Sequence, residues 1–465
     1  MWLWLASTAL AAEPTLRPHD TAIHERALSL FGIAAFVGIA WLISENRKRI
    51  NWRPVLWGIG LQLAFGAVIL SPAVSQFFFT VVNTSVDKLL EFSGAGATFV
   101  FQSTEPHLVQ TGFEPGNSQQ FVGQISPPVK TFAFWILPTI VFFSALMSAL
   151  YHLGVMQVIV RGLAWVMVRT LGTSGAESLS TAGNIFVGQT EAPLLIKPFV
   201  GVMTRSELMA VMTGGFATVA GGVLGAYVGF LDNIPNIAGH LVIASIISAP
   251  AALAIAKIMV PETEEPTTRG KVVLPGGTTK SNIMEAIADG ATEGMKLALN
   301  VAAMLIAIVA LVAMFDFMVS LVPVTFCEGG VAGGYACAVG EGEPLSLSLI
   351  LGWIFAPIAF LMGVPWDECA IVGRLLGEKI VLTEFVAYIN LGGLLADGAL
   401  SERGAVIASY ALCGFANFAS IGIQIGGIGG IAPEKMPVLA SLGFRAMVAG
   451  VIAACMTGSI AGIML

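Results

Sequence analysis

The sequence predicts an all-α protein that crosses a membrane many times. It is 56% hydrophobic and only 11% charged, with a mean hydropathy of +0.84, whereas a soluble domain carries about 25% charged residues. Long apolar runs alternate with short charged loops, and two further apolar segments are interrupted by polar residues. The 53 glycines indicate close helix contacts or broken helices. The net charge of −7, without a long basic tract, gives no indication of nucleic-acid binding.

Eight apolar stretches are long enough to span a bilayer, which requires about 20 residues. They cover residues 27–44, 54–82, 129–153, 207–231, 238–260, 294–322, 404–429 and 436–463. The interrupted segments, near 178–200 and 372–396, are not predicted to be simple spans. Residues 346–363 contain Pro357, and we expect them to lie at the membrane interface or partly embedded. A long loop is predicted at 86–128, without an assigned role.

Lysine and arginine in the short loops predict the orientation. The loop after the first span, Glu45–Arg49 (ENRKR), is predicted to be cytoplasmic, which leaves the N-terminus outside. The apolar start, MWLWLASTALAA, is similar to a signal peptide without its basic region, or it is an N-terminal tail. Further basic residues fall on the cytoplasmic side if 178–200 enters and leaves there; they are Arg161, Arg169, Lys257, Arg269, Lys271 and Lys280. Both interrupted segments are then re-entrant hairpins opening to opposite sides, and the C-terminus is outside.

The two interrupted segments belong to a repeat. Thr190-Glu191 in the first is followed by Gly215-Phe216-Ala217-Thr218, and Thr383-Glu384 in the second is followed by Gly414-Phe415-Ala416-Asn417. A charged linker, Pro261–Asn282, separates the copies. With hairpins that open to opposite sides, this is an inverted repeat, which is the architecture of secondary transporters.

Polar side chains in these segments are predicted to converge near the middle of the membrane. A carboxylate there costs about 2.5–3.5 kcal/mol on insertion scales and is functional by default. The converging set is Gln189, Thr190, Glu191, Thr218, Glu384, Asn417 and Ser420. The alternative is that they only bond neighbouring backbone, and that Phe415 is an ordinary packing residue.

Three motifs resemble, in the expected order, those of the concentrative nucleoside transporters. They are GNIFVGQTEAPL (Gly183–Leu194), LTEFVAY (Leu382–Tyr388) and CGFANFASIG (Cys413–Gly422), and the resemblance covers about residues 27–465. It implies a homotrimeric importer of nucleosides in a bacterial inner membrane, coupled to sodium or protons. It also implies eight spans, two re-entrant hairpins and an elevator mechanism, in which a transport domain carries the site across a fixed scaffold.

This interpretation divides the chain along its length. The expected parts are a tail (1–26), scaffold helices (27–153), a first transport repeat (177–260), a cytoplasmic linker with an interfacial helix (261–293), a sixth span with an outside loop (294–345) and a second transport repeat (346–465).

The resemblance also implies roles at the matching positions. The nucleobase would be faced by Gln189, Thr190, Glu191 and Val223. The ribose hydroxyls would be held by Glu384, Asn417 and Ser420, and Phe415 would pack against the nucleoside. A sodium ion would be bound, partly through backbone oxygens, by Asn184, Val187, Thr218 and Val219. No organic cofactor is expected. The chemistry agrees, because a carboxylate accepts both hydrogen bonds of a ribose diol and an amide matches a base edge.

The coupling ion and the substrate class have alternatives. The motif GQTEAP favours sodium, because proton-coupled members of the family tend to carry Ser in place of Thr190 and to lack the following Ala-Pro. A dicarboxylate or amino-acid carrier would need a cationic anchor, and Lys197 lies at the end of its hairpin. An intramembrane enzyme and an open channel are further alternatives, although no His–Glu metal motif occurs and two mirrored hairpins argue against a pore.

Five cysteines occur in the chain. Cys369, Cys413 and Cys455 lie in apolar or hairpin segments, where a buried free thiol is expected. Cys327 and Cys337 lie in a loop predicted to be outside, where an oxidising periplasm would permit a disulfide.

Overall fold

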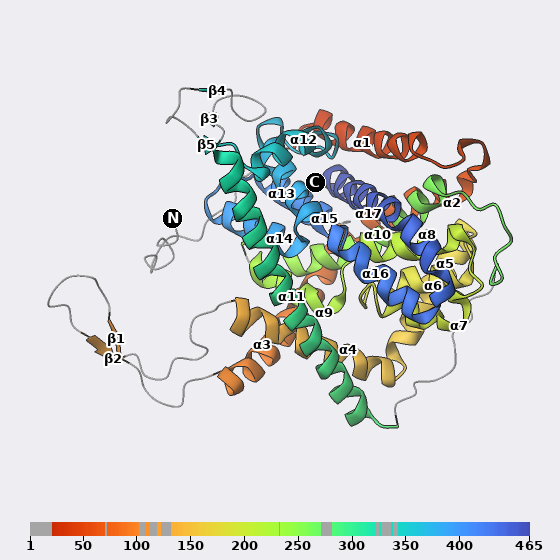
Figure 1. Ribbon diagram of the computed structural model, residues 1–465, viewed down its shortest axis with the longest axis horizontal. Coiled ribbons are helices and arrows are strands. Elements are labelled where there is room, and N and C mark those ends of the chain that lie inside the picture. The colour runs from red at the N-terminus through yellow and green to blue at the C-terminus, as the bar shows by residue number, and fades with distance from the viewer. Residues whose placement is uncertain are drawn as a thin grey trace.

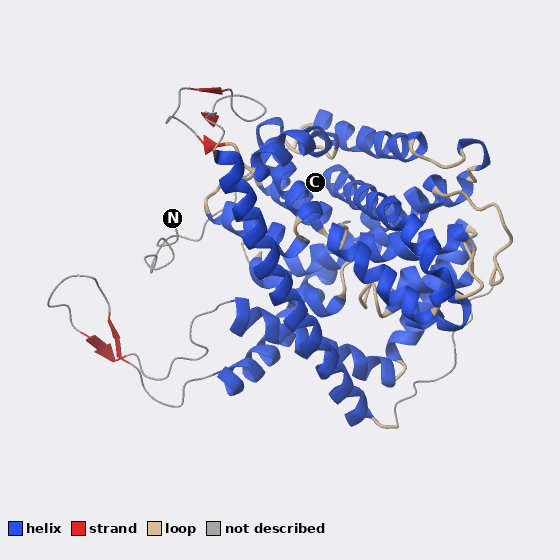
Figure 2. Cartoon of the chain, viewed as in Figure 1, coloured by secondary structure: helices blue, strands red, loops and turns tan. Residues whose placement is uncertain are grey.

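The computed structural model describes residues 21–69, 72–101, 108–110, 119–121, 132–231, 233–270, 281–321, 325–326, 336–337 and 343–465. Most of the predicted N-terminal tail, much of the predicted 86–128 loop and Cys327 of the predicted disulfide lie outside this set, as does the side chain of Cys337. The described chain is almost entirely helical (Figures 1 and 2), so the predicted all-α fold class is confirmed at this level.

The first part of the chain forms five long helices. They are α1 (Ile23–Leu42), α2 (Trp52–Ile69), α3 (Pro72–Phe101), α4 (Leu137–His152) and α5 (Val155–Leu171), with a short helix η1 (Arg47–Arg49) after α1 and a π-helical turn η2 (Phe132–Ile136) before α4. The predicted single span 54–82 is wrong, because α2 ends at Ile69 and a new helix begins at Pro72. Proline lacks the N–H that would continue a helix but suits a first turn. The predicted loop is also shorter, since α3 continues to Phe101.

The middle of the chain contains the first hairpin and the first broken helix. The elements are α6 (Gly175–Gly183), η3 (Ala192–Ile196), α7 (Lys197–Val200), α8 (Arg205–Ala217), α9 (Gly221–Phe230) and α10 (Ile237–Met259). Helix α6 packs against η3, so the chain reverses between them. Thr204 caps α8, because its Oγ1 accepts from the Glu207 backbone N–H at 3.1 Å. The Glu207 carboxylate in turn accepts from the Thr204 backbone N–H at 2.9 Å.

The last part of the chain repeats this order after one long helix. The elements are α11 (Ile283–Ser320), α12 (Leu347–Leu361), η4 (Trp366–Glu368), α13 (Cys369–Val381), α14 (Glu384–Ala396), α15 (Glu402–Leu412), α16 (Phe418–Ile431), η5 (Pro433–Lys435) and α17 (Met436–Met464). The expected interfacial helix before residue 294 and the span after it are one continuous helix, α11, because no proline interrupts them. Helix α13 packs against α14 as a second hairpin, and α12 lies along α13.

Short strands complete the described elements. Strand β1 (Leu108–Gln110) pairs antiparallel with β2 (Gln119–Phe121). Strand β3 (Thr325–Phe326) lies between β4 (Ala336–Cys337) and β5 (Glu343–Pro344), antiparallel to both.

Seven of the described helices are long and apolar enough to cross a membrane. The predicted span 404–429 is not among them; it is divided between α15 and α16, and α16 is one of the shorter apolar helices. Burial separates the central helices from the peripheral ones: 89% of the apolar window of α10 is buried, against 6% of that of α11. Helix α11 runs diagonally across the outside of the bundle (Figure 1).

The two helix breaks are held by close backbone contacts. The Gly221 N–H, at the start of α9, donates to the carbonyl of Phe186 in the first hairpin at 2.9 Å. At the second break, Gly414 has φ +136°, and a Cβ there would lie 2.7 Å from the carbonyl oxygen of Phe216 at the end of α8. Only glycine accepts this backbone conformation and this approach. The two breaks are therefore in contact at the centre of the fold.

Candidate functional site

A cavity of about 350 Å³ lies where the two hairpins and the two broken helices meet. One wall comes from the hairpins and the breaks, and the opposite wall comes from α4 and α11. Every residue predicted to contact the substrate lines this cavity: Gln189, Thr190, Glu191, Val223, Glu384, Phe415, Asn417 and Ser420. The fold thus brings together residues separated by more than two hundred positions in the sequence.

Glu384 is fixed at one end of the cavity by two hydrogen bonds. The carboxylate begins helix α14 and is 3% exposed. Its Oε1 accepts from the Tyr227 hydroxyl at 3.0 Å, and its Oε2 accepts from Asn417 Nδ2 at 3.1 Å. Tyr227 is held in turn by stacking on Tyr388, with ring centroids 4.5 Å apart. Because a carboxylate has about four acceptor positions, both oxygens can still accept hydrogen bonds from a molecule in the cavity.

Asn417 is held at the first turn of α16. Its Oδ1 caps that helix by accepting from the Ser420 N–H at 2.8 Å, which leaves Nδ2 directed to Glu384. The amide oxygen of Asn417 therefore stabilises the helix, while its amide nitrogen holds Glu384 in the cavity.

Gln189 occupies the other polar end. Its Nε2 donates to Ser420 Oγ at 3.1 Å, and its Oε1 accepts from Gln424 Nε2 at 2.9 Å. Gln424, which is 1% exposed, also donates to the carbonyl of Met212 at 3.2 Å. This chain of bonds sets which way the amide of Gln189 faces. Ser420, predicted to hold the ribose, bonds residues of both ends, because its Oγ accepts from Gln189 and its N–H donates to Asn417.

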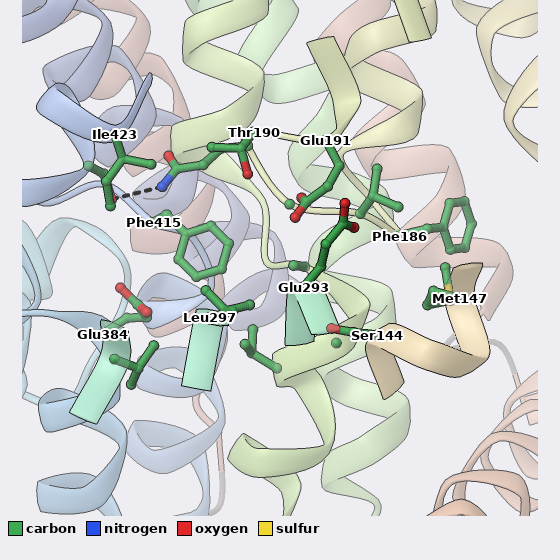
Figure 3. A pocket seen from close by; sticks show the side chains of 18 of the residues that line it. Ser144, Met147, Phe186, Thr190, Glu191, Glu293, Leu297, Glu384, Phe415 and Ile423 are labelled. Atoms are coloured by element: carbon green, nitrogen blue, oxygen red, sulfur yellow. Dashed lines mark hydrogen bonds between the residues drawn. The ribbon is translucent and has the colours of Figure 1, made fainter. Parts of the chain in front are cut away.

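Glu191 faces a second carboxylate across the cavity. Figure 3 shows Glu191 of the first hairpin and Glu293 of α11 pointing toward one another, while Glu384 lies beyond Phe415. The two are close enough to interact electrostatically. Together with Glu384, they give the cavity a negative character, and none of the described residues that line it is Lys, Arg or His.

The residues predicted to bind sodium gather at the ends of two helices. Asn184 follows the last turn of α6 and Thr218 follows the last turn of α8, so both helices direct C-terminal carbonyls toward this region. Asn184 is 1% exposed, and neither its Oδ1 nor its Nδ2 has a hydrogen-bond partner among the described residues. A buried amide without partners is costly, so the oxygen fits a cation ligand. Val219 is buried in the same break, and Val187 lines the cavity.

Several site residues were not predicted from the sequence. Gln424 could have been found, because it follows Asn417 by seven positions and shares a helix face with Ser420. Tyr227 and Glu293 had no comparable signal. Tyr227 lies in an apolar run, and Glu293 lies at the boundary between the predicted interfacial helix and the predicted span.

The architecture defines a class of protein. Two hairpins and two broken helices that enclose a polar site within a multi-pass helical membrane protein are typical of secondary transporters. Three family models match the chain: the "Na+ dependent nucleoside transporter N-terminus" at residues 31–104, "Nucleoside recognition" (Gate) at 133–233, and the "Na+ dependent nucleoside transporter C-terminus" at 240–462. The chain belongs to the concentrative, sodium-dependent nucleoside transporter family.

Individual relatives agree with this membership. The uncharacterized transporter YutK of Bacillus subtilis is 40% identical over 434 residues, which cover 93% of this chain and 98% of the relative. Human solute carrier family 28 member 3 is 39% identical over 485 residues, and the match covers all of this chain but only 64% of that protein. The chain thus spans less than two thirds of the length of its mammalian relatives.

Solved structures share the fold. The structure of CNTnw in an inward-facing substrate-bound state is 38% identical, with a TM-score of 0.79 over 95% of this chain and 98% of that one. A variant of CNTnw in an outward-facing state has a TM-score of 0.80. The relatives are transporters, so the alternative of an intramembrane enzyme is wrong.

Proposed function

We propose that this protein imports nucleosides by coupling their movement to a sodium gradient. The observation that carries the proposal is Glu384, a buried carboxylate held by Tyr227 and Asn417 at one end of the central cavity. The cavity volume of about 350 Å³ is within the range of about 300–1,000 Å³ that is usual for small-molecule sites. A neutral solute with a diol at one end and a polar ring at the other fits this arrangement.

The two ends of the cavity suit the two parts of a nucleoside. Glu384 can accept hydrogen bonds from both ribose hydroxyls, and bonds to a charged acceptor are the stronger kind. Gln189 and Thr190 lie at the other end and offer donors and acceptors to a base edge. Phe415 lies between Glu384 and Glu191 (Figure 3), where an aromatic ring can pack against the base or sugar.

Sodium is the coupling ion that the polar groups suit best. Asn184 and Thr218 contribute an amide and a hydroxyl oxygen, and the ends of α6 and α8 contribute backbone carbonyls. The Thr218 hydroxyl donates to the Gly214 carbonyl at 2.8 Å, which leaves its oxygen lone pairs for a cation. Hard cations prefer such oxygen ligands. The same break borders the substrate cavity through Ala220 and Val223, so an ion bound there would support the substrate site.

The membrane arrangement belongs to the same proposal. Both hairpins would be re-entrant and open to opposite sides, as an inverted repeat requires. Residues 177–260 and 346–465 would form the transport domain of an elevator, and residues 27–153 and 294–345 would form the scaffold of a homotrimer. Both termini would lie outside the inner membrane of a bacterium.

Uptake into proteoliposomes tests the function directly. Radiolabelled uridine and adenosine should accumulate against their gradients when sodium is higher outside, and uptake should saturate and stop when the sodium gradient is collapsed. Uptake driven by a pH gradient in sodium-free buffer would replace sodium by the proton. Uptake that neither saturates nor needs a gradient would indicate a channel, and sodium-driven uptake of another polar solute without nucleosides would overturn the substrate class.

A further inference from the structure

A second hollow of about 540 Å³ lies away from the central cavity, between α2 and α5. Three arginines line it, Arg53 of α2 and Arg161 and Arg169 of α5, together with Trp165, Val168 and Gly270. None of these arginines forms an ion pair with a carboxylate among the described residues. The hollow is therefore a concentration of positive charge without a counter-ion among the described residues.

Hydrogen bonds and helix spacing hold these arginines close together. Arg53 donates through Nε to the Thr170 carbonyl at 3.1 Å and through Nη2 to the Arg169 carbonyl at 3.0 Å. It thereby caps the C-terminal end of α5, where a positive charge is favoured. Arg161 and Arg169 are two turns apart on α5, with Trp165 between them on the same face. The guanidinium of Arg169 lies 5.9 Å from the centre of the Trp165 ring.

The side chains around the hollow are of the kinds that are typical of a membrane surface. Helix α5 buries one face, which contains Met156, Val160 and Ala164, and exposes the other. The exposed face carries apolar side chains beside the arginines: Val158 is 72% exposed and Trp165 is 58% exposed. An exposed helix face that combines basic and apolar side chains suits a position at the membrane interface. Trp52 and Trp57 are also exposed on the membrane-crossing helix that starts beside Arg53, and tryptophan is enriched at this level.

We propose that this hollow, the α2–α5 arginine pocket, binds the headgroup of an anionic phospholipid. Arginine suits a phosphate diester because its planar group can donate two parallel hydrogen bonds. Basic pockets beside membrane helices on the cytoplasmic side bind anionic headgroups, and the basic Arg47–Arg49 loop just before α2 indicates that side here. The apolar side chains of the same face would contact the acyl chains, which distinguishes a lipid from free phosphate.

Native mass spectrometry on the full-length protein in detergent tests this site. Phosphatidylglycerol should be retained in preference to phosphatidylcholine. The double variant Arg161→Gln/Arg169→Gln should lower the affinity for phosphatidylglycerol about thirtyfold, or about fivefold for each arginine removed. The matched control is Lys48→Gln, which removes an exposed charge from the neighbouring loop without lining the hollow; its affinity should change less than twofold. Equal retention of both lipids, or unchanged affinity in the double variant, would contradict the proposal.

A second measurement locates the lipid and identifies its chemical source. Phosphatidylglycerol with brominated chains should quench part of the tryptophan fluorescence, and Trp165→Phe should remove that part. Inorganic phosphate at the same concentration should not displace the lipid; displacement would mean that the pocket serves a soluble anion. If the glutamine variant does not fold, Arg161→Lys/Arg169→Lys keeps the charge but loses the paired geometry, and it should still weaken binding several-fold. Unchanged binding in that variant would also overturn the proposal.

Discussion

Replacement of Glu384 by glutamine should weaken nucleoside binding while the protein still folds. The side chain is 3% exposed and its two oxygens accept from Tyr227 at 3.0 Å and Asn417 at 3.1 Å. Glutamine keeps the shape and one acceptor oxygen, and the Tyr227 hydroxyl can reverse to accept from the new amide. The fold around the hairpin is therefore retained, whereas the charge that strengthens hydrogen bonds to the ribose is lost.

The size of the effect follows from this loss. A hydrogen bond to a charged group contributes about 1.5–3 kcal/mol, so losing the charge at one ribose hydroxyl should weaken binding about 10- to 150-fold. Isothermal titration calorimetry with uridine in saturating sodium would give this ratio directly. Uptake into proteoliposomes should show the same change as a higher half-saturating uridine concentration.

A matched control and a second ligand separate this mechanism from general damage. Glu378→Gln changes a carboxylate of the same hairpin that bonds Ser348 at 2.9 Å and Asn390 at 2.8 Å and does not line the cavity. It should leave uridine affinity within about threefold. For 2′,3′-dideoxyuridine, the wild type should bind poorly and Glu384→Gln should add little further loss. Wild-type affinity in Glu384→Gln, or an equal loss for both ligands, would refute the reasoning.

Four further predictions concern the sodium site, the charge of the cavity lining, the backbone at Gly414 and the cysteine pair Cys327 and Cys337. Thr218→Val should raise the sodium concentration for half-maximal uptake about tenfold, while Thr213→Val, which loses a similar hydroxyl bond one turn earlier, should not. Uridine 5′-monophosphate should fail to compete with uridine, because the described cavity lining contains carboxylates and no cation; competition within tenfold would contradict this. Gly414→Ala should lower the unfolding midpoint and uptake, since the strained backbone costs about 1–3 kcal/mol, whereas Gly422→Ala meets open space and should not. Alkylation of non-reduced protein should leave Cys327 and Cys337 unlabelled, and full labelling would remove the predicted disulfide.

The repeat could be predicted because the same residue types recur in the same order in both copies. Thr-Glu and Gly-Phe-Ala occur twice, in the same order, in an apolar chain, where a carboxylate is costly and therefore conspicuous. The structure places both Thr-Glu pairs on hairpins and both Gly-Phe-Ala motifs at helix breaks. Every residue predicted to contact the substrate lines one cavity for this reason.

The helix boundaries were harder to predict, because a hydropathy average does not show where one apolar helix ends and the next begins. The apolar run through Ile69 and Pro72 has no polar interruption large enough to divide it on a hydropathy scale, yet the structure has two helices there. The contribution of α4 and α11 to the cavity wall could not be predicted from the sequence either. Glu293 faces Glu191 only because α11 crosses the bundle diagonally, and the crossing of two distant helices leaves no local pattern in the sequence.

The two copies of the repeat differ in where the broken helix ends and in which side chain bonds it. Helix α8 continues through Ala217, whereas α15 ends at Leu412, before Gly414. Three residues before each Gly-Phe-Ala motif, a buried carbonyl of the broken helix accepts a hydrogen bond from outside that helix. In the first copy, Met212 accepts from the neutral amide of Gln424 at 3.2 Å. In the second, Ala411 accepts from Lys379 Nζ at 2.9 Å, and that lysine is 1% exposed. Equivalent carbonyls thus accept from a side-chain amide in one copy and from a lysine Nζ in the other. A repeated motif therefore predicts that a helix breaks close to it. The side chain that bonds each broken helix comes from elsewhere in the fold, so it has to be found in the structure.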